Sequence, residues 1–250
     1  MRLALITGGQ QGIGLGIATA LAANGFRIAL SAELPPDHPT VKSALTQLPD
    51  AQYIQHDLAE IAQIPTLLDC VEGTLGPITT LISNAGVPAR IRGDMLDLTP
   101  ENFDHTLNIN LRGSFFLAQA VAKRMLARPS DSYRALIFIT SVSAAMASIE
   151  RAEYCLSKSA AAMMAQLFAL RLASRNIGVY ELRPGIIDTA MTAAVHDAYT
   201  ARLTQGLVPA TRWGQPADIA SVVLPLALGQ FAFATGAVIP VDGGLSLQRL

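Results

Sequence analysis

The residues best suited to acid–base chemistry in this chain are Tyr154 and Lys158, which lie four positions apart. Residues with this spacing share one face of a helix, so the phenol and the ammonium can meet. A free phenol is a poor base near neutral pH, but a neighbouring ammonium favours the phenolate. The pair is therefore suited to moving a proton on or off an alcohol oxygen. The alternative is a surface helix with an isolated tyrosine, although the chain holds only three lysines among 18 basic residues.

A serine thirteen residues before the tyrosine is the second candidate. Ser141 follows an unbroken apolar run, Leu136–Ile139, that is typical of a buried strand. A hydroxyl at the carboxyl end of such a strand can hydrogen-bond a substrate carbonyl and stabilise its developing negative charge. The alternative is a serine that starts a turn or caps a helix.

A glycine-rich segment, Thr7–Gly14, comes directly after the first apolar run and before a predicted helix. Glycines at positions 8, 12 and 14 permit a tight turn and a close approach of the backbone to a pyrophosphate. The following helix would present free N–H groups and its partial positive charge to that anion. The spacing GxxxGxG differs from the common GxGxxG fingerprint. A glycine turn needed only for packing therefore remains an alternative.

Strand-length apolar runs alternate with helix-length amphipathic stretches along the whole chain. The predicted strands are Arg2–Thr7, Phe26–Ser31, Gln52–His56, Thr79–Ser83, Arg134–Thr140, Ile177–Leu182 and Ala237–Val241, and the predicted helices are Ile13–Asn24, Thr40–Leu48, Ile61–Leu75, Pro100–Ala127, Ala152–Asn176 and Pro216–Leu228. Strands that are apolar on both sides indicate a parallel sheet covered on both faces by helices. We expect one doubly wound, Rossmann-type α/β domain over residues 1–250, with a seven-stranded sheet. Such sheets bind ligands at the carboxyl ends of their strands.

The composition excludes several other classes of protein. The 250 residues are 51% hydrophobic and carry a formal net charge of −1, which argues against disorder and gives no electrostatic footprint for nucleic acid. No stretch approaches the roughly 18 apolar residues of a membrane span. Two cysteines cannot form a disulfide framework, so we expect a cytoplasmic protein. None of the four histidines has metal-ligand spacing, so no metal site is expected.

Taken together, these features resemble the short-chain dehydrogenase/reductase family, and in particular its 3-oxoacyl-acyl-carrier-protein reductase-like members. The resemblance extends from Leu3 to Gly244. Its motifs, in the order and spacing of that family, are Thr7–Gly14, Asn84-Ala85-Gly86, Asn108-Ile109-Asn110-Leu111, Ser141, Tyr154 with Lys158, Arg183-Pro184-Gly185 and Val241-Asp242-Gly243-Gly244.

The resemblance implies a nicotinamide-dependent oxidoreductase that acts on a carbonyl or a secondary alcohol. Tyr154 would be the catalytic acid/base, Lys158 would bind the nicotinamide ribose, Ser141 would orient the substrate oxygen, and Asn110 would hold a water that links Lys158 to solvent. The residues expected at the cofactor are Gly8, Gln11, Gly12, Ile13, Gly14, Ala32, Glu33, Asp57, Leu58, Asn84, Ala85, Gly86, Tyr154, Lys158, Pro184, Gly185, Ile187 and Thr189. A non-catalytic dinucleotide-binding regulator and a redox-neutral dehydratase or epimerase are the alternatives, because the fold alone does not fix the function.

The end of the second strand indicates which dinucleotide is used. Ala32 stands where the family's NAD-selecting aspartate is expected, and Glu33 follows it. A carboxylate here accepts hydrogen bonds from the 2′-hydroxyl and repels a 2′-phosphate. No arginine or lysine lies between Ile28 and Val41, so a 2′-phosphate would have no evident cationic partner at this turn. We expect NAD, with NADP as the alternative.

The segment Ala190–Arg212 is expected to form a substrate lid, about residues 190–212, as in the family. Its apolar side chains, Met191, Ala194, Tyr199, Leu203 and Leu207, either bind a hydrophobic substrate or pack the lid on the core. His196 on this segment is a candidate for contact with the substrate. Arg90, Arg92 and Arg151 lie on loops expected near the entrance, where they either attract an anion such as an acyl-carrier phosphopantetheine or are merely solvated.

The charged share of 15% is low for a chain of this length. The helix Ala152–Asn176 is apolar around more of its circumference than contact with one sheet requires. We therefore expect subunit contacts, and a homotetramer formed through the helices 100–127 and 152–176 as is common in the family. The expected partners are a small carbonyl or alcohol substrate and other copies of the chain, with no nucleic acid and no membrane.

Overall fold

Seven apolar segments form one parallel sheet in the computed structural model, which describes residues 2–248 except for the side chain of Ala194. The strands are β1 (Arg2–Thr7), β2 (Phe26–Ala32), β3 (Gln52–Gln55), β4 (Thr80–Ser83), β5 (Arg134–Ile139), β6 (Ile177–Pro184) and β7 (Val238–Val241). Their order across the sheet is β3-β2-β1-β4-β5-β6-β7. All seven predicted strands are therefore confirmed, with ends that shift by a few residues.

The strand order reverses between β1 and β4. Successive strands are added outward on one side up to β3, and on the other side from β4 to β7. At such a reversal, the connections from the two neighbouring strands leave toward opposite faces, and a crevice opens at their carboxyl ends. The arrangement confirms the predicted doubly wound α/β fold.

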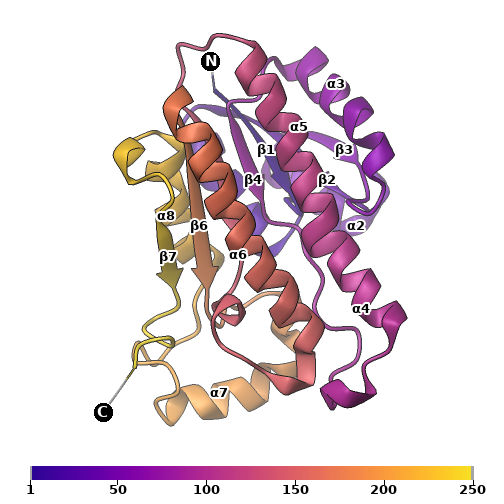
Figure 1. Cartoon of the computed structure of the whole chain (residues 1–250), viewed down its shortest axis with the longest axis vertical. Coiled ribbons are helices and arrows are strands. Elements are labelled where there is room, and N and C mark those ends of the chain that lie inside the picture. Colours follow the sequence, from indigo (N-terminus) through magenta and orange to yellow (C-terminus); the bar gives the residue numbers. More distant parts are fainter. Residues whose placement is uncertain (1, 249–250) are drawn as a thin grey trace.

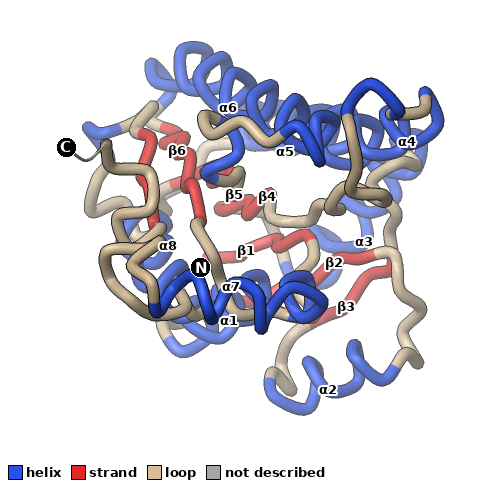
Figure 2. Tube along the Cα trace, turned by 90° about the horizontal axis from the view of Figure 1, so that it is seen from below, coloured by secondary structure: helices blue, strands red, loops and turns tan. Residues whose placement is uncertain are grey.

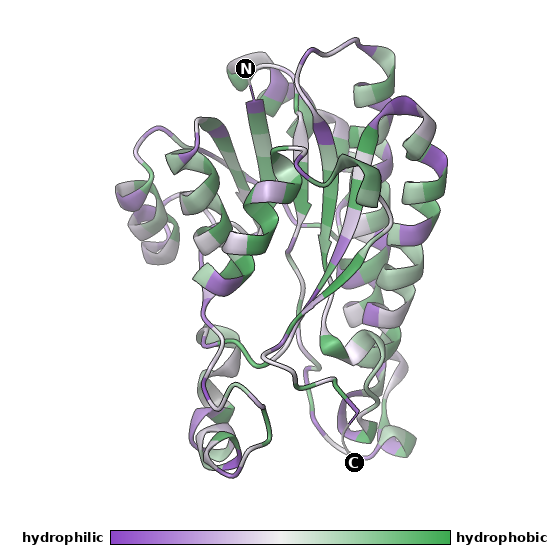
Figure 3. Cartoon of the chain, turned by 90° about the vertical axis from the view of Figure 1, so that its left-hand side faces the viewer, coloured by the Kyte–Doolittle hydropathy of each residue, from purple (hydrophilic) through white to green (hydrophobic). Residues whose placement is uncertain are grey.

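Helices cover both faces of the sheet (Figures 1 and 2). One face carries α1 (Gly12–Ala23), α2 (Pro39–Gln47) and α8 (Pro216–Ala227), and the other carries α3 (Ile64–Leu75), α4 (Pro100–Leu107), α5 (Ser114–Ala127) and α6 (Ala152–Leu172). Buried residues form two apolar clusters, one under each layer of helices. Figure 3 shows the strands mainly in hydrophobic colours, as expected for a sheet that is buried on both sides.

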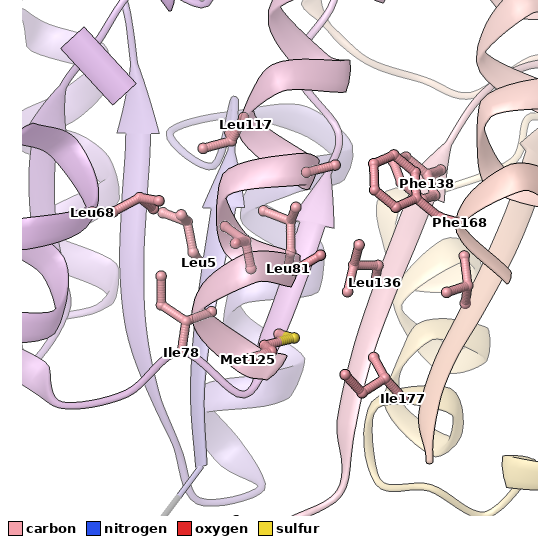
Figure 4. Packing of buried hydrophobic residues seen from close by; sticks show 14 of the residues in the cluster. Leu5, Leu68, Ile78, Leu81, Leu117, Met125, Leu136, Phe138, Phe168 and Ile177 are labelled. Carbon is pink, nitrogen blue, oxygen red and sulfur yellow. The ribbon is translucent and has the colours of Figure 1, made fainter. Parts of the chain in front are cut away.

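The larger cluster lies between the sheet and the layer of α3, α5 and α6. Leu5, Leu81 and Leu136 project from three neighbouring strands toward side chains of the helices, as Figure 4 shows. On β5, Phe138 stacks on Phe168 of α6, with 5.9 Å between the ring centroids. Alternate residues of the same strands, such as Ile6 and Ile137, pack under α1 and α8. The alternation along each strand therefore supplies both cores.

The predicted helix Pro100–Ala127 is interrupted, which corrects the sequence prediction. Between α4 and α5, residues Asn108–Gly113 form a wider π-helical turn, a feature that is frequent at functional sites. Gly113 ends this turn where the chain presses on the loop after β3: a Cβ at Gly113 would lie 2.0 Å from the carbonyl oxygen of Leu58. The turn also places Asn110 in the interior, where it is buried.

The predicted connection Ala190–Arg212 also contains more structure than the sequence indicated. A 3₁₀ segment, Ala190–Val195, is followed by helix α7 (His196–Thr204). The Thr189 and Thr192 side chains form a reciprocal capping box at the start of the segment. Trp213 then anchors α7, because its indole N–H donates to Thr200 Oγ1 at 3.0 Å and its ring stacks on His196 with centroids 4.6 Å apart.

Two helical glycines offer a direct test of the packing at the π turn. Gly113→Ala should lower the free energy of unfolding by about 1–3 kcal/mol, because the added methyl meets backbone atoms that cannot move aside easily. The matched control is Gly73→Ala in α3, where an added Cβ meets nothing within 4 Å. That change should raise stability by about 0.5–1 kcal/mol. Denaturant unfolding of both variants measures the difference, and equal effects would contradict the close contact at Gly113.

Candidate active site

A cavity of about 590 Å³ lies at the carboxyl ends of the strands. Its walls come from the segments that follow β1 to β6, from the N-terminal part of α6 and from the segment around α7. In Figure 1 the arrows of β6 and β7 point toward the end of the molecule where α7 lies. The cavity is therefore at the edge of the sheet where the fold class predicts a ligand.

The glycine-rich segment forms the turn between β1 and α1. Gly8 and Gly12 have φ of +64° and +53°, a conformation that glycine adopts readily. Gly14 is needed for packing instead, because a Cβ there would lie 2.2 Å from the carbonyl oxygen of Gly8. Among the residues that the structure describes, no side chain caps the N-terminus of α1. Its first N–H groups and its positive dipole end are therefore suited to a phosphate.

Asn84 holds this turn against the end of β4. Its Nδ2 donates to the carbonyl oxygens of Thr7 at 2.9 Å and Gly8 at 3.3 Å. In return, Thr7 Oγ1 accepts from the backbone N–H groups of Asn84 and Ala85, both at 3.0 Å. Asn84, Ala85 and Gly86 all line the cavity, and the bonds of Asn84 and Ala85 join the end of β4 to the end of β1.

Asn110 lies behind the cavity wall rather than on it. Its Oδ1 accepts from Val87 N at 2.8 Å, and its Nδ2 donates to Val87 O at 3.0 Å and to Ser157 Oγ at 3.1 Å. Ser157 Oγ in turn donates to the carbonyl oxygen of Tyr154 at 2.8 Å. One amide side chain therefore joins the loop after β4 to the first turns of α6.

The Tyr154 and Lys158 side chains lie beside each other in the cleft. Lys158 Nζ is 5.7 Å from the centroid of the Tyr154 ring and donates to the carbonyl oxygen of Ile139 at 3.2 Å. Lys158 is only 7% exposed. Gly86 fits between this ammonium and Asn110, since a Cβ there would lie 3.5 Å from Nζ and 3.0 Å from Asn110 Oδ1. The Arg151 guanidinium lies over the same tyrosine ring, 5.7 Å from its centroid.

Ser141 also lines the cavity, at the end of β5. Its Oγ accepts from Ser143 N at 3.1 Å, so it caps a short 3₁₀ turn, as the structural alternative predicted. The residue before it is tied to a buried ion pair: Thr140 Oγ1 donates to Glu181 Oε1 at 2.7 Å, and Arg183 Nε donates to the same oxygen at 2.7 Å. This charge-assisted network fixes the chain directly before Ser141.

The far end of the cavity is formed where β2 and β3 end. Ser31, Ala32 and Glu33 line it, together with Asp57 and Leu58. Glu33 is exposed, and among the described lining residues no arginine or lysine comes from β2, β3 or the glycine turn.

A histidine at this end was not predicted from the sequence. His56 is buried and lines the cavity. Burial lowers its pKa against the opposing effects of Asp57 and Glu60. The imidazole is therefore held uncharged near neutral pH and supplies no cation for a phosphate.

The segment after β6 closes the opposite end. Pro184, Gly185, Ile187 and Thr189 line the cavity, and a Cβ on Gly12 would lie 3.3 Å from Thr189 Cγ2. The glycine turn and the start of the lid segment are therefore in contact.

The apolar side chains of residues 190–212 differ in their surroundings. Met191, Tyr199 and Leu207 line the cavity, whereas Leu203 is buried and packs the segment on the domain. His196 does not line the cavity and stacks on Trp213 instead. The side chain of Ala194 is outside the described part of the structure.

The cavity brings together almost all of the predicted site residues. Of that set, only Gly14 and Asn110 do not line it. Sequence reasoning missed further lining residues, among them Gln10, His56, His105, Arg202 and Leu245. Of these residues, Gln10 could have been identified from the sequence, because it lies within the glycine-rich segment. Of the entrance arginines, Arg92 and Arg151 line the cavity, and Arg90 does not.

Within residues 2–248, no cluster of three or more His, Cys, Asp and Glu side chains is placed to hold a metal ion. In the same residues, no helix is both long enough and apolar enough to cross a membrane.

Comparison with known proteins places this arrangement in a family. Residues 8–246 match the family model described as Enoyl-(Acyl carrier protein) reductase. The chain is similar to a 3-oxoacyl-acyl-carrier-protein reductase of Mycobacterium bovis, with 34% identity over 250 residues that cover 98% of this chain and 93% of the relative.

Two solved structures share the fold over the full length. One is a 3-oxoacyl-acyl-carrier-protein reductase from Brucella melitensis in complex with NAD, with 45% identity, a TM-score of 0.95 and coverage of 100% of this chain and 98% of that chain. The other is a variant of the actinorhodin polyketide ketoreductase with NADPH, with 27% identity, a TM-score of 0.90 and coverage of 99% of this chain and 98% of that chain. The match to a family model over nearly the whole chain, together with this level of identity, shows that the chain belongs to the short-chain dehydrogenase/reductase family.

Proposed function

We propose that this protein interconverts 3-oxoacyl and 3-hydroxyacyl thioesters, with Tyr154 as the acid/base. At the coarser level, it is a nicotinamide-dependent oxidoreductase of carbonyl and alcohol groups. The observation that carries the proposal is the buried Lys158 ammonium beside the Tyr154 ring, in the cleft that the glycine turn also lines. A redox-neutral enzyme or a non-catalytic regulator finds no support among the relatives.

The described residues fit a nicotinamide dinucleotide, which supplies or accepts the hydride when bound. Gly8 and Gly12 leave the space that a pyrophosphate needs at the N-terminus of α1. Lys158 has one recorded hydrogen bond, to Ile139 O, so two of its three N–H donors are available for ribose hydroxyls. The Oε1 atom of Gln10, buried in the glycine segment, has no partner among the described atoms.

The proposed proton transfer uses three side chains. In the reductive direction, Tyr154 donates its phenolic proton to the substrate oxygen as that oxygen gains negative charge. The Ser141 hydroxyl donates a hydrogen bond to the same oxygen. Lys158 stabilises the phenolate that remains, and in oxidation the phenolate accepts the proton of the alcohol. Asn110 positions α6 relative to the loop after β4 through Val87 and Ser157.

We propose NAD as the preferred dinucleotide. Glu33 is exposed at the end of β2, where its carboxylate can accept hydrogen bonds from a ribose 2′-hydroxyl and repel a 2′-phosphate. Neutral His56 supplies no compensating charge at this end. The related structures include one complex with NAD and one with NADPH.

Two kinds of side chain in the cleft wall support the substrate class. The apolar side chains of Met146, Met191 and Leu207 suit an acyl chain, while Arg92, Arg151 and Arg202 add positive charge to the wall of the same cavity. An acyl thioester on a phosphorylated carrier combines these two properties. The named relatives from Mycobacterium bovis and Brucella melitensis carry the same substrate class in their names.

We also propose that the protein is a homotetramer. The outer side of α6 exposes Leu156, Met163, Leu167 and Leu170 by 53–82% of their surface, and Phe116 of α5 is exposed beside them. Exposed apolar side chains grouped on neighbouring helices are typical of an interface between subunits. A monomeric mass in light scattering at micromolar concentration would exclude this assembly.

Removal of one phenolic hydroxyl tests the proposed catalyst. Tyr154→Phe should lower kcat about 10²–10⁴-fold, since the proton donor is lost, while the dissociation constant of the dinucleotide stays within about threefold of wild type. The matched control is Tyr199→Phe, which removes a hydroxyl from the same cleft and should retain turnover. Steady-state kinetics and fluorescence titration with NADH measure both. Turnover that is retained in Tyr154→Phe would contradict the assignment of Tyr154 as the acid/base.

Replacing the Glu33 carboxylate by an amide tests the choice between NAD and NADP. The wild-type kcat/KM should favour NADH over NADPH, and Glu33→Gln should reduce that ratio about tenfold by removing a charged hydrogen-bond acceptor. Glu101→Gln on α4, outside the cleft, should leave the ratio unchanged. A wild-type enzyme that uses NADPH tenfold better than NADH contradicts the proposal.

Two neighbouring arginines test the substrate class. Arg92→Gln should raise KM about three- to tenfold for a 3-oxoacyl thioester of coenzyme A, because one charged contact is lost. It should leave KM unchanged for the N-acetylcysteamine thioester, which has no phosphate. Arg90→Gln is the matched control, as Arg90 does not line the cavity. Equal effects on both thioesters would argue against an anionic carrier.

A further inference from the structure

Two short segments, residues 90–94 and 149–153, separate the active-site cleft from a second cavity. They are joined by a hydrogen bond from Gly93 N to Glu150 O at 3.2 Å. Arg92 and Arg151 line the cleft, whereas their neighbours Ile91, Gly93, Glu150 and Ala152 line the second cavity, whose volume is about 260 Å³. One side of this wall therefore carries the arginines Arg92 and Arg151, and the other side lines the second cavity.

Glu153 is the feature of the second cavity that requires an explanation. The residue lines the cavity and is only 1% exposed. Its Oε1 is buried and has no hydrogen-bond partner, and no ion pair is recorded for its carboxylate within residues 2–248. A buried carboxylate without a partner costs several kcal/mol by general estimates. The catalytic mechanism proposed above does not use this side chain.

The other lining residues make the cavity acidic and partly apolar. Asp94, Asp97 and Glu150 add carboxylates, and no arginine, lysine or histidine is among the described lining residues. One Asp94 oxygen is already used, since it accepts from Leu96 N at 3.0 Å. Apolar side chains line the same cavity: Ile91, Met95, Leu98 and Ile149.

The placement of the carboxylates favours an organic cation over a metal ion. Within residues 2–248, no three His, Cys, Asp or Glu side chains are grouped closely enough to share a metal. A guanidinium or an ammonium needs only one carboxylate at hydrogen-bond distance. Its aliphatic stem can cover the apolar lining, as the stems of arginine and lysine do.

We propose that this second cavity binds a small organic cation, a guanidinium or ammonium group on a short aliphatic stem, with Glu153 as its counter-ion. The amide of Asn102, which also lines the cavity, offers a further acceptor. This site lies across the wall from the cleft and does not depend on the substrate or the cofactor of the reaction.

Titration calorimetry with n-butylguanidinium tests the proposal directly. Saturable binding is expected for the wild-type protein, and neither butyramide nor butyrate, which match the stem without the positive charge, should bind. Glu153→Gln should weaken the binding at least tenfold, as expected for the loss of about 1.4 kcal/mol or more. The matched control, Glu101→Gln, changes an exposed glutamate of α4 outside the cavity and should leave the binding unchanged. Binding of equal strength to wild type and Glu153→Gln, or no saturable binding to wild type, overturns the proposal.

A second test places a positively charged side chain in the cavity by substitution, so the proposal is tested by more than one variant. Asn102→Arg brings a guanidinium into the cavity from α4 and should raise the melting temperature while abolishing binding of n-butylguanidinium. The gain in melting temperature should disappear in the double variant Asn102→Arg with Glu153→Gln. A gain that persists in the double variant, or butylguanidinium binding that persists in Asn102→Arg, contradicts a cation site at Glu153. Cation binding and melting temperature do not depend on turnover, so a failure of the cation site can be distinguished from a failure of the proposed reaction.

Discussion

The hydrogen bonds between the ends of β1 and β4 are the constraint on which the site depends. The strand order reverses at this pair, so the connections that follow the two strands leave toward opposite faces and a crevice opens at their carboxyl ends. Thr7 Oγ1 and Asn84 Nδ2 tie the two ends together with five bonds to backbone groups. Because these groups are largely shielded from water, each bond is stronger than at an exposed position. These hydrogen bonds therefore fix the position of the glycine turn and of the cleft beside it.

The strands could be predicted from the sequence because their signal is local. A run such as Leu136–Ile139 is apolar on both sides, and only a strand buried under two helical layers satisfies it. The π turn at Asn108–Gly113 carries no comparable signal, since its residues fit an ordinary helix equally well. It is set by contacts from elsewhere in the chain: Val87 holds Asn110, and Leu58 excludes a side chain at Gly113. Helix α7 likewise depends on Trp213, which follows it.

The candidate site was predictable to the extent that its residues sit at strand ends. Ser141, Asp57 and Asn84 each follow a predicted strand, and the topology gathers such positions at one edge of the sheet. His105 and Arg202 come from helices instead, and Leu245 comes from the C-terminal tail. Their place in the cleft depends on how those segments pack. Resemblance to a family identified the motif residues, whereas these three needed the structure.

The first turn of α6 shows how a chain with few charges can separate two charged environments. Successive residues of a helix are about 100° apart around its axis, so Glu153 and Tyr154 face different surroundings although they are adjacent. The Arg151 and Lys158 cations both lie over the Tyr154 ring, whereas Glu153 lines the acidic second cavity. A carboxylate on the cleft side would offset those cations and disfavour the phenolate. The helix therefore holds its one buried carboxylate on the side of the second cavity, away from the tyrosine that requires positive charge.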